Sequence, residues 1–350
     1  MFDNTAANNT GVGHQTLFEN TSGTRNAAVA AFAMANNTTG NDNTSVGYNA
    51  LSQNTTASNN TAVGSAALQV NTTGTALAAL GANALYSNTT GSSNVAVGHN
   101  ALHTNTTAQE NTAVGKSALR LNTTAGGNTG IGSKALESNT TGAANTAVGA
   151  SCLDANTTAS NNTAVGDNAL GANTEGNENT AVGRSTLADN TTGGQNTGIG
   201  RMALQVNTTG TGNTALGWKA GDNITTGDNN IVIGSGADAS SATVDNEITL
   251  GDSNITKFRI PGIDFFLKDN SGTPTQGHVL TVDGSGEASF EAPTGGATGG
   301  GSDKIFYENG QTVTTDYTIT SGNNAMSAGP ITIQNGVSVT VPSNSTYTIV

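Results

Sequence analysis

The residues of this sequence that could do acid–base chemistry are its carboxylates. Hydrolysis of a glycosidic bond needs two of them, held about 5–10 Å apart in a groove. The acidic residues of the later part of the chain gather instead where turns are expected: Asp222, Asp228, Asp238, Asp245, Glu247 and Asp252. We interpret them as solvated turn residues that keep the chain soluble. The sequence therefore predicts no catalytic residue and no enzyme.

Histidine and cysteine give no sign of a metal or cofactor site. The histidines His14, His99, His103 and His278 lack the spacing of metal ligands, and we expect them at exposed, variable positions. The single cysteine, Cys152, excludes an intrachain disulfide and a cysteine-based zinc cluster. It stands where other repeats have alanine, which predicts a small buried thiol. We expect no cofactor, with an ion near Asp245–Asp252 left as an alternative although no EF-hand spacing is present.

Charge and composition exclude several classes of partner. The net charge is −13 with only 11 Lys and Arg, so no basic patch is available for nucleic acid or for an anionic membrane surface. No apolar stretch is long enough to span a membrane, and MFDNTAANNTG lacks the basic and apolar regions of a secretory signal. With 4% aromatic residues and 47 glycines, the chain cannot fill a wide core, which indicates a thin, repetitive scaffold.

A 17-residue repeat organises most of the chain. Its consensus is N-T-A-V-G-x-x-A-L-x-x-N-T-T-[GA]-x-x, and the single substitution in the glycine column is Ala30. The glycines that mark the period are Gly13, Gly47, Gly64, Gly81, Gly98, Gly115, Gly132, Gly149, Gly166, Gly183, Gly200, Gly217, Gly234 and Gly251. Because the phase never slips, each unit must be one turn of a stacked structure.

Two aliphatic columns repeat with this period. An aliphatic, mostly β-branched residue precedes each glycine, and a leucine follows four residues after it in most units. We expect both columns to face the interior of the stack. Their representatives are Val63, Val97, Val114, Ile131, Val148, Val165 and Val182 in the first column, and Leu68, Leu102, Leu119, Leu136 and Leu153 in the second.

Two asparagine columns repeat where turns are expected. Their representatives are Asn54, Asn71 and Asn88 in one column, and Asn111, Asn145 and Asn162 in the other. Asparagine suits corners because its side chain bonds to nearby backbone groups. Stacked copies of one asparagine can also bond to each other, which predicts hydrogen-bonded ladders.

These columns predict an all-β fold, a parallel β-roll or β-solenoid of 17-residue coils. A helical solenoid is excluded because the recurring Gly and Asn-Thr-Thr would interrupt every helix. Coils about 4.8 Å apart make a rod roughly 70 Å long. A single stack buries few large side chains per coil, so we expect three parallel chains to turn an aliphatic column toward a common axis.

The sequence divides into three segments. Residues 1–253 form the repeat shaft, and 254–303 contain a neck around KFRIPGIDFFLKD, a hairpin in HVLTVDGSGEASFEA and a Gly-rich linker. Residues 304–350 form a small C-terminal β module with period-two alternation in QTVTTDYTIT, PITIQNG, VSVTVP and STYTIV.

The units NTAVG, NTGIG and NVAVG resemble the head repeats of trimeric autotransporter adhesins, which form a left-handed parallel β-roll of three chains. The unit here is longer by an ALxxNTTG arm. Together with ITLGDSNITKFRIPG and GHVLTVDGSGEASFEAP, the repeats are more similar to bacteriophage tail fibres and related appendages. The segment NNAMSAGPITIQNGVSVTVPSNSTYTIV resembles a C-terminal module of virion proteins of marine phages, particularly those that infect cyanobacteria.

The resemblance implies a structural fibre of a phage virion, a tail fibre or appendage, that acts as a stiff shaft and a multivalent host-attachment element. Its partners would be two further copies of the chain in a homotrimer, other virion tail or appendage proteins, and a host-surface receptor such as a polysaccharide or outer-membrane component. Nucleic acid binding and membrane insertion are not expected. The location would be the virion, and the extracellular space after host lysis.

Three alternatives stay open. A bacterial trimeric surface adhesin would need export and an outer-membrane anchor, for which we find no signal in the sequence. A polysaccharide-degrading phage spike would need the carboxylate pair discussed above. Ice binding would use a column of threonines such as Thr112, Thr129 and Thr146, but we expect this column to share the interior side of its strand with valine.

Overall fold

The computed structural model describes residues 6–259, 279–282, 288–291 and 311–350. The chain divides into two compact units, Met1–Phe258 and Arg259–Val350. All regular elements in the described residues are β-strands, and these residues contain no helix of the length and apolarity needed to cross a membrane. The predicted all-β class is thus confirmed.

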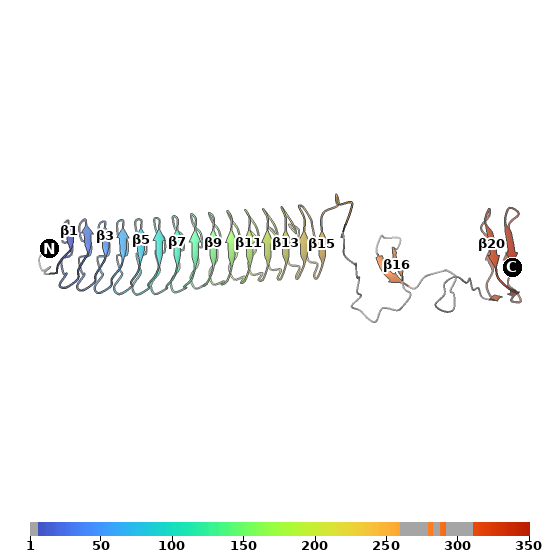
Figure 1. Ribbon diagram of the computed structural model, residues 1–350, viewed down its shortest axis with the longest axis horizontal. Helices are drawn as coiled ribbons and strands as arrows, with labels where there is room; N and C mark the ends of the chain where they lie inside the picture. The colour runs from blue at the N-terminus through green and yellow to red at the C-terminus, as the bar shows by residue number, and fades with distance from the viewer. Residues whose placement is uncertain (1–5, 260–278, 283–287, 292–310) are drawn as a thin grey trace. The chain divides into compact units, whose positions relative to one another are not determined.

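The first unit is a parallel β-solenoid whose strands stack in chain order in one 15-stranded sheet (Figure 1). Each strand pairs with the residues 17 positions later, as Thr163 does with Thr180. The strands are β1 (Thr10–Val12), β2 (Ala27–Val29), β3 (Thr44–Val46), β4 (Thr61–Val63), β5 (Ala78–Leu80), β6 (Val95–Val97), β7 (Thr112–Val114), β8 (Thr129–Ile131), β9 (Thr146–Val148), β10 (Thr163–Val165), β11 (Thr180–Val182), β12 (Thr197–Ile199), β13 (Thr214–Leu216), β14 (Ile231–Ile233) and β15 (Ile248–Leu250). The predicted one-coil-per-unit stacking is confirmed.

The glycine after each strand makes the corner of the coil. Gly115 has a φ of 136°, a conformation that side chains rarely adopt. A Cβ added to Gly115 would also lie 2.6 Å from the carbonyl carbon of Gly132 in the next coil. Both the backbone angle and the close approach of neighbouring coils therefore require glycine at this position.

The leucine column forms the core of the solenoid, as predicted. Leu68, Leu102, Leu119, Leu136 and Leu153 are all fully buried. They pack with small side chains, mostly alanine, from the middle of each strand and from the position before each leucine. The core is therefore one large side chain wide, and leucine fills it in most coils up to Leu204.

The aliphatic column before the glycines does not face this core, and the prediction was wrong there. Ile131, Val165 and Val182 are 39%, 37% and 37% exposed. Val63, Val97, Val114 and Val148 are only half-buried.

The reason is that side chains alternate between the two faces of each three-residue strand. A three-residue strand with its middle side chain inward turns its first and third side chains outward. The inward space is also narrow, because a Cβ added to Gly130 in the middle of β8 would lie 3.4 Å from Cγ of Leu119. The inward position therefore takes small residues, and the larger aliphatic residue lies outside.

The two asparagine ladders are confirmed. In the first ladder the side-chain amide of each asparagine donates to the side-chain carbonyl one coil earlier: Asn54 to Asn37 at 2.7 Å, Asn71 to Asn54 at 3.1 Å and Asn88 to Asn71 at 2.9 Å. In the second ladder the backbone amide is the donor: Asn111 to Asn94 at 2.9 Å, Asn145 to Asn128 at 2.9 Å and Asn162 to Asn145 at 3.0 Å. Buried amide groups are thus satisfied between coils as well as within them.

The core changes composition near the C-terminal end of the shaft. Gly221 takes the place of the leucine, while Ile224 takes the place of the ladder asparagine and is fully buried. A Cβ at Gly221 would lie 3.4 Å from Cδ1 of Ile224, so isoleucine occupies the space that leucine fills elsewhere. The exchange ends the ladder, and Oδ1 of Asn207 is left buried without a hydrogen-bond partner.

The second unit contains short strand pairs. Strands β16 (Val279–Val282) and β17 (Ala288–Glu291) pair antiparallel, which confirms the predicted hairpin. The other strands are β18 (Thr312–Val313), β19 (Tyr317–Thr318), β20 (Asn324–Ser327), β21 (Thr332–Ile333), β22 (Val339–Thr340) and β23 (Thr346–Ile349). They pair in parallel as β18–β21, β19–β22 and β20–β23, so residues 311–350 wind as two stacked coils. Most of the predicted neck, the Gly-rich linker and His278 lie outside the described residues.

Candidate interaction surface

The outward side of the fifteen-stranded sheet is the largest regular surface of the shaft. We define the outer face as the first and third residues of β1–β15. The first residue is most often threonine and the third is always Val, Ile or Leu. None of these residues is charged, although 10% of the chain is. The outer face is therefore a charge-free strip of methyl groups and hydroxyls.

The aliphatic members of this face are exposed to an unusual degree for a folded chain. Val46 is 39% exposed, Leu80 51% and Leu216 47%. At its C-terminal end the first residues become aliphatic too, with Ile231 37% and Ile248 65% exposed. Exposed apolar surface in this amount makes the outer face a candidate interaction surface.

The size of the outer face matches a protein interface. Fifteen strands at about 4.8 Å spacing and about 10 Å of strand width give roughly 700 Å² per chain. Standard interfaces bury about 800 Å² per partner. The outer face alone thus approaches the area that a stable contact between copies needs.

The coils hold the strands of this face in register. Backbone bonds join each strand to its neighbours, as from the Thr112 amide to the Asn128 carbonyl at 2.8 Å and from the Gly115 amide to the Val97 carbonyl at 2.7 Å. Behind the sheet, the amides of Asn145 and Asn156 both donate to the carbonyl of Ala159, at 2.8 and 3.0 Å. One asparagine from each ladder therefore holds the same turn carbonyl in this coil.

Ion pairs of the shaft lie at other positions of the coil. Arg120 contacts Glu137 at 2.9 Å and Arg184 contacts Asp167 at 3.6 Å, each between adjacent coils. Exposed pairs of this kind contribute little to stability. Their positions show where charge is tolerated, and the outer face is not among them.

Aromatic rings form short stacks on the N-terminal coils. The rings of His14 and Phe32 are 5.4 Å apart, those of Phe32 and Tyr48 are 5.9 Å apart, and those of Tyr86 and His103 are stacked at 5.2 Å. Burial lowers the pKa of His103, with smaller contributions from Arg120 and His99. His14 and His99 are exposed as predicted, whereas His103 is half-buried.

The acidic residues near the end of the shaft include one close pair. Burial raises the pKa of Asp238, and the adjacent carboxylate of Asp222 raises it further. Lys219 contacts Asp222 at 2.9 Å.

Another predicted turn residue, Glu247, accepts hydrogen bonds from the amide and hydroxyl of Ser240, which lower the pKa of its carboxyl. Thr249 also donates to Glu247, at 2.8 Å. Across the described ranges, no group of three or more His, Cys, Asp or Glu side chains could hold a metal ion.

Cys152 is a small buried thiol, as predicted. It is fully buried, and its Sγ donates to the carbonyl of Ala164 at 3.2 Å. Burial raises the pKa of the Cys152 thiol to about 12. A thiol in this state is inert rather than nucleophilic.

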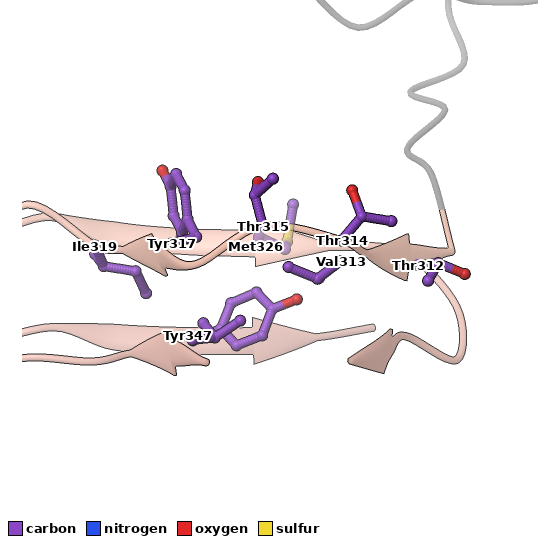
Figure 2. Close-up of a pocket in the computed structure, with 10 residues that line it drawn as sticks. Thr312, Val313, Thr314, Thr315, Tyr317, Ile319, Met326 and Tyr347 are labelled. Carbon is purple, nitrogen blue, oxygen red and sulfur yellow. The ribbon is translucent and has the colours of Figure 1, made fainter. Parts of the chain in front are cut away.

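The second unit has a cavity of about 410 Å³ between its short strands. Figure 2 shows Val313, Ile319 and Tyr347 lying between two layers of strands, while Thr314, Thr315 and Tyr317 extend away from the upper layer. The hydroxyls of Ser327 and Tyr347 are 2.6 Å apart. Most side chains of this module are exposed, and the cavity is not filled by its own residues.

Comparisons with known proteins add no family to this picture, since no family model, no curated protein and no solved structure matches the chain. The fold and the surfaces of the chain itself are therefore the basis for its function.

Proposed function

We propose that this protein is a structural fibre of a phage virion, a tail fibre or appendage, in which the solenoid is a stiff shaft and three copies present host-binding surfaces together. The observation that carries the proposal is the outer face, a charge-free strip that remains half-exposed in a single chain. Three parallel chains that turn these faces toward a common axis would bury the aliphatic column along the whole shaft.

Multivalency follows from such an assembly. Three equivalent binding surfaces on one stiff rod raise the avidity for a polysaccharide or outer-membrane receptor without a strong single contact. The surfaces that vary between coils are the residues after each glycine, among them Tyr48, Lys116, Arg184 and Trp218. Tyr48 and Trp218 are 54% and 49% exposed, as a contact residue must be.

The assembly is tested by measuring the mass of the purified protein in solution by light scattering. The wild-type chain has a mass of 34.6 kDa. The measured mass should be three times that value, and the particle should appear as a rod in electron micrographs. Val148→Asp places a charge on the outer face and should dissociate the rod. Ala150→Asp is the matched control, because this exposed position two residues away carries Asp167 in the next coil. A monomeric wild-type protein, or a Val148→Asp variant whose shafts stay together as one rod in electron micrographs, would contradict the proposal.

The location of the protein is tested on purified phage virions. Mass spectrometry of purified virions should detect the chain, and gold-labelled antibodies should mark it on a tail or appendage. If the chain is found on a bacterial envelope instead, the surface-adhesin alternative replaces this proposal. Release of oligosaccharides from host polysaccharide by the purified protein would favour the depolymerising spike.

Ice binding is a second candidate because the threonine column faces outward. The sequence placed Thr112, Thr129 and Thr146 inside, but each is the half-exposed first residue of its strand. With strands about 4.8 Å apart and alternate residues about 6.6 Å apart, the outer face is a regular array of hydroxyls and methyls. Thermal hysteresis by a monomeric protein would support this candidate, and its absence in a trimer with a buried face would exclude it.

A further inference from the structure

The C-terminal module, residues 311–350, has almost no core of its own. Ile319, at 2% exposure, is the hydrophobic side chain that is buried in it. Six other apolar side chains are exposed: Tyr317, Met326, Ile333, Val341, Ile349 and Val350. Its three sheets have two strands each, so every strand leaves one edge unpaired.

Domains of about 40 residues need disulfides, a bound metal or a partner to stay folded. This module has no cysteine and no histidine, and Asp316 is its one charged residue. Disulfides and metal ligation by cysteine or histidine therefore cannot stabilise the module. A partner outside residues 311–350 is the remaining source of stability.

The character of the module points to a second copy of itself as that partner. A surface with one carboxylate in 40 residues meets its own copy with little like-charge repulsion, although the whole chain carries a net charge of −13. The 410 Å³ cavity gives room for apolar side chains from outside the chain. Unpaired parallel strands also accept further strands of the same kind.

We propose that residues 311–350 form an association module that folds only against other copies of the same module. The exposed apolar side chains on β20 and β21 contact neighbouring copies, and the assembly fills the cavity that one copy leaves open. This association is separate from that of the outer face, and it holds for the chain whichever structure carries the fibre.

The test is hydrogen exchange of the full-length protein, followed by mass spectrometry of peptides from 311–350. Because folding is coupled to association, their protection should fall on dilution, while peptides from the middle of the shaft stay protected. The double variant Met326→Asp/Ile333→Asp should lose protection of the module at least tenfold at any concentration. Asn335→Asp/Ser343→Asp is the matched control, which adds the same charge at exposed turn positions and should keep protection.

The same experiment in the Val148→Asp background separates the two associations. If the shaft no longer associates but module peptides remain protected in an oligomer, the module proposal stands and the outer-face contact alone is affected. Module peptides that are protected in a chain shown by sedimentation to be monomeric would overturn the module proposal. So would protection that neither dilution nor the Met326→Asp/Ile333→Asp pair reduces.

Discussion

Asn156 donates its side-chain amide to the side-chain carbonyl of Asn139, one coil earlier, at 2.7 Å. The same amide donates to the carbonyl of Ala159 within its own coil, at 3.0 Å. One asparagine thus ties a turn to itself and to its neighbour, and both groups are fully buried. Because these side chains are buried, no water can replace the hydrogen bonds of the ladder if they are broken.

We expect Asn156→Ala to lower the free energy of unfolding by about 3 kcal/mol, because it removes the donor to the buried side-chain carbonyl of Asn139 and one of the two acceptors of the Asn173 amide. Denaturant unfolding followed by circular dichroism measures the loss. Thr158→Ala, at an exposed position of the same turn, should change stability by less than about 0.5 kcal/mol. Equal effects of the two substitutions would show that the ladder does not stabilise the shaft.

Glycine corners give a pair of opposite predictions. Gly149→Ala should destabilise the shaft, since φ is 145° and a Cβ would lie 2.6 Å from the carbonyl carbon of Gly166. Ala30→Gly should stabilise it by about 1 kcal/mol, because Ala30 has a φ of 97° where all other repeats have glycine. Thermal unfolding midpoints should shift in opposite directions; a shift in the same direction contradicts the corner geometry.

The exchange at Gly221 and Ile224 predicts energetic coupling. Gly221→Leu should overpack the core, because a Cβ there lies 3.2 Å from Cδ2 of Leu204 and 3.4 Å from Cδ1 of Ile224. Ile224→Asn should leave a cavity beside Gly221. The double variant restores both consensus residues and gives Oδ1 of Asn207 a donor, so it should cost at least about 1 kcal/mol less than the sum. Additive effects in a double-mutant cycle would refute the compensation.

Cys152 should resist alkylation in the folded protein. With the thiol pKa raised to about 12, from 9.0, it stays protonated at pH 8 and is shielded from reagent. Its contribution to stability is complete below pH 9 and is lost as the pH rises toward 12, because the unfolded thiol ionises first. Labelling with iodoacetamide should be slow natively and fast in denaturant, and Cys152→Ala should keep the fold. Rapid native labelling would show that the coil opens.

The first asparagine ladder carries glycosylation sequons, for example at Asn122, Asn139 and Asn156, and these side chains are fully buried. Expression through a eukaryotic secretory pathway should attach glycans before folding and prevent the coils from stacking. The product should be glycosylated and sensitive to protease. Alanine at the exposed third sequon positions, Thr124, Thr141 and Thr158, removes these acceptors but keeps the ladder, so it should increase the protease-resistant fraction.

The sequence period was sufficient to predict the coil, its leucine core and both ladders, since each depends on residues that recur at one spacing. The period was not sufficient to predict which strand residues face the core. Valine before each glycine is apolar, and apolarity alone favours the inside; the informative signal was the middle residue, as in Ala113, Gly130 and Ala147, which is always small up to β13. A column restricted to small side chains marks a crowded interior. Nor does the sequence show that Leu119 has a φ of 52°, because leucine rarely adopts this conformation without tertiary packing.

Hydrogen bonds between coils join residues 16 to 18 positions apart, so each coil depends only on the two that flank it. A whole unit inserted in phase, or removed, would meet the same neighbours on both sides and leave every other rung unchanged. The length of the shaft can therefore change in equal increments of about 4.8 Å. Duplication of one repeat unit in the gene would therefore lengthen the shaft by one coil without any change to the fold of the other coils.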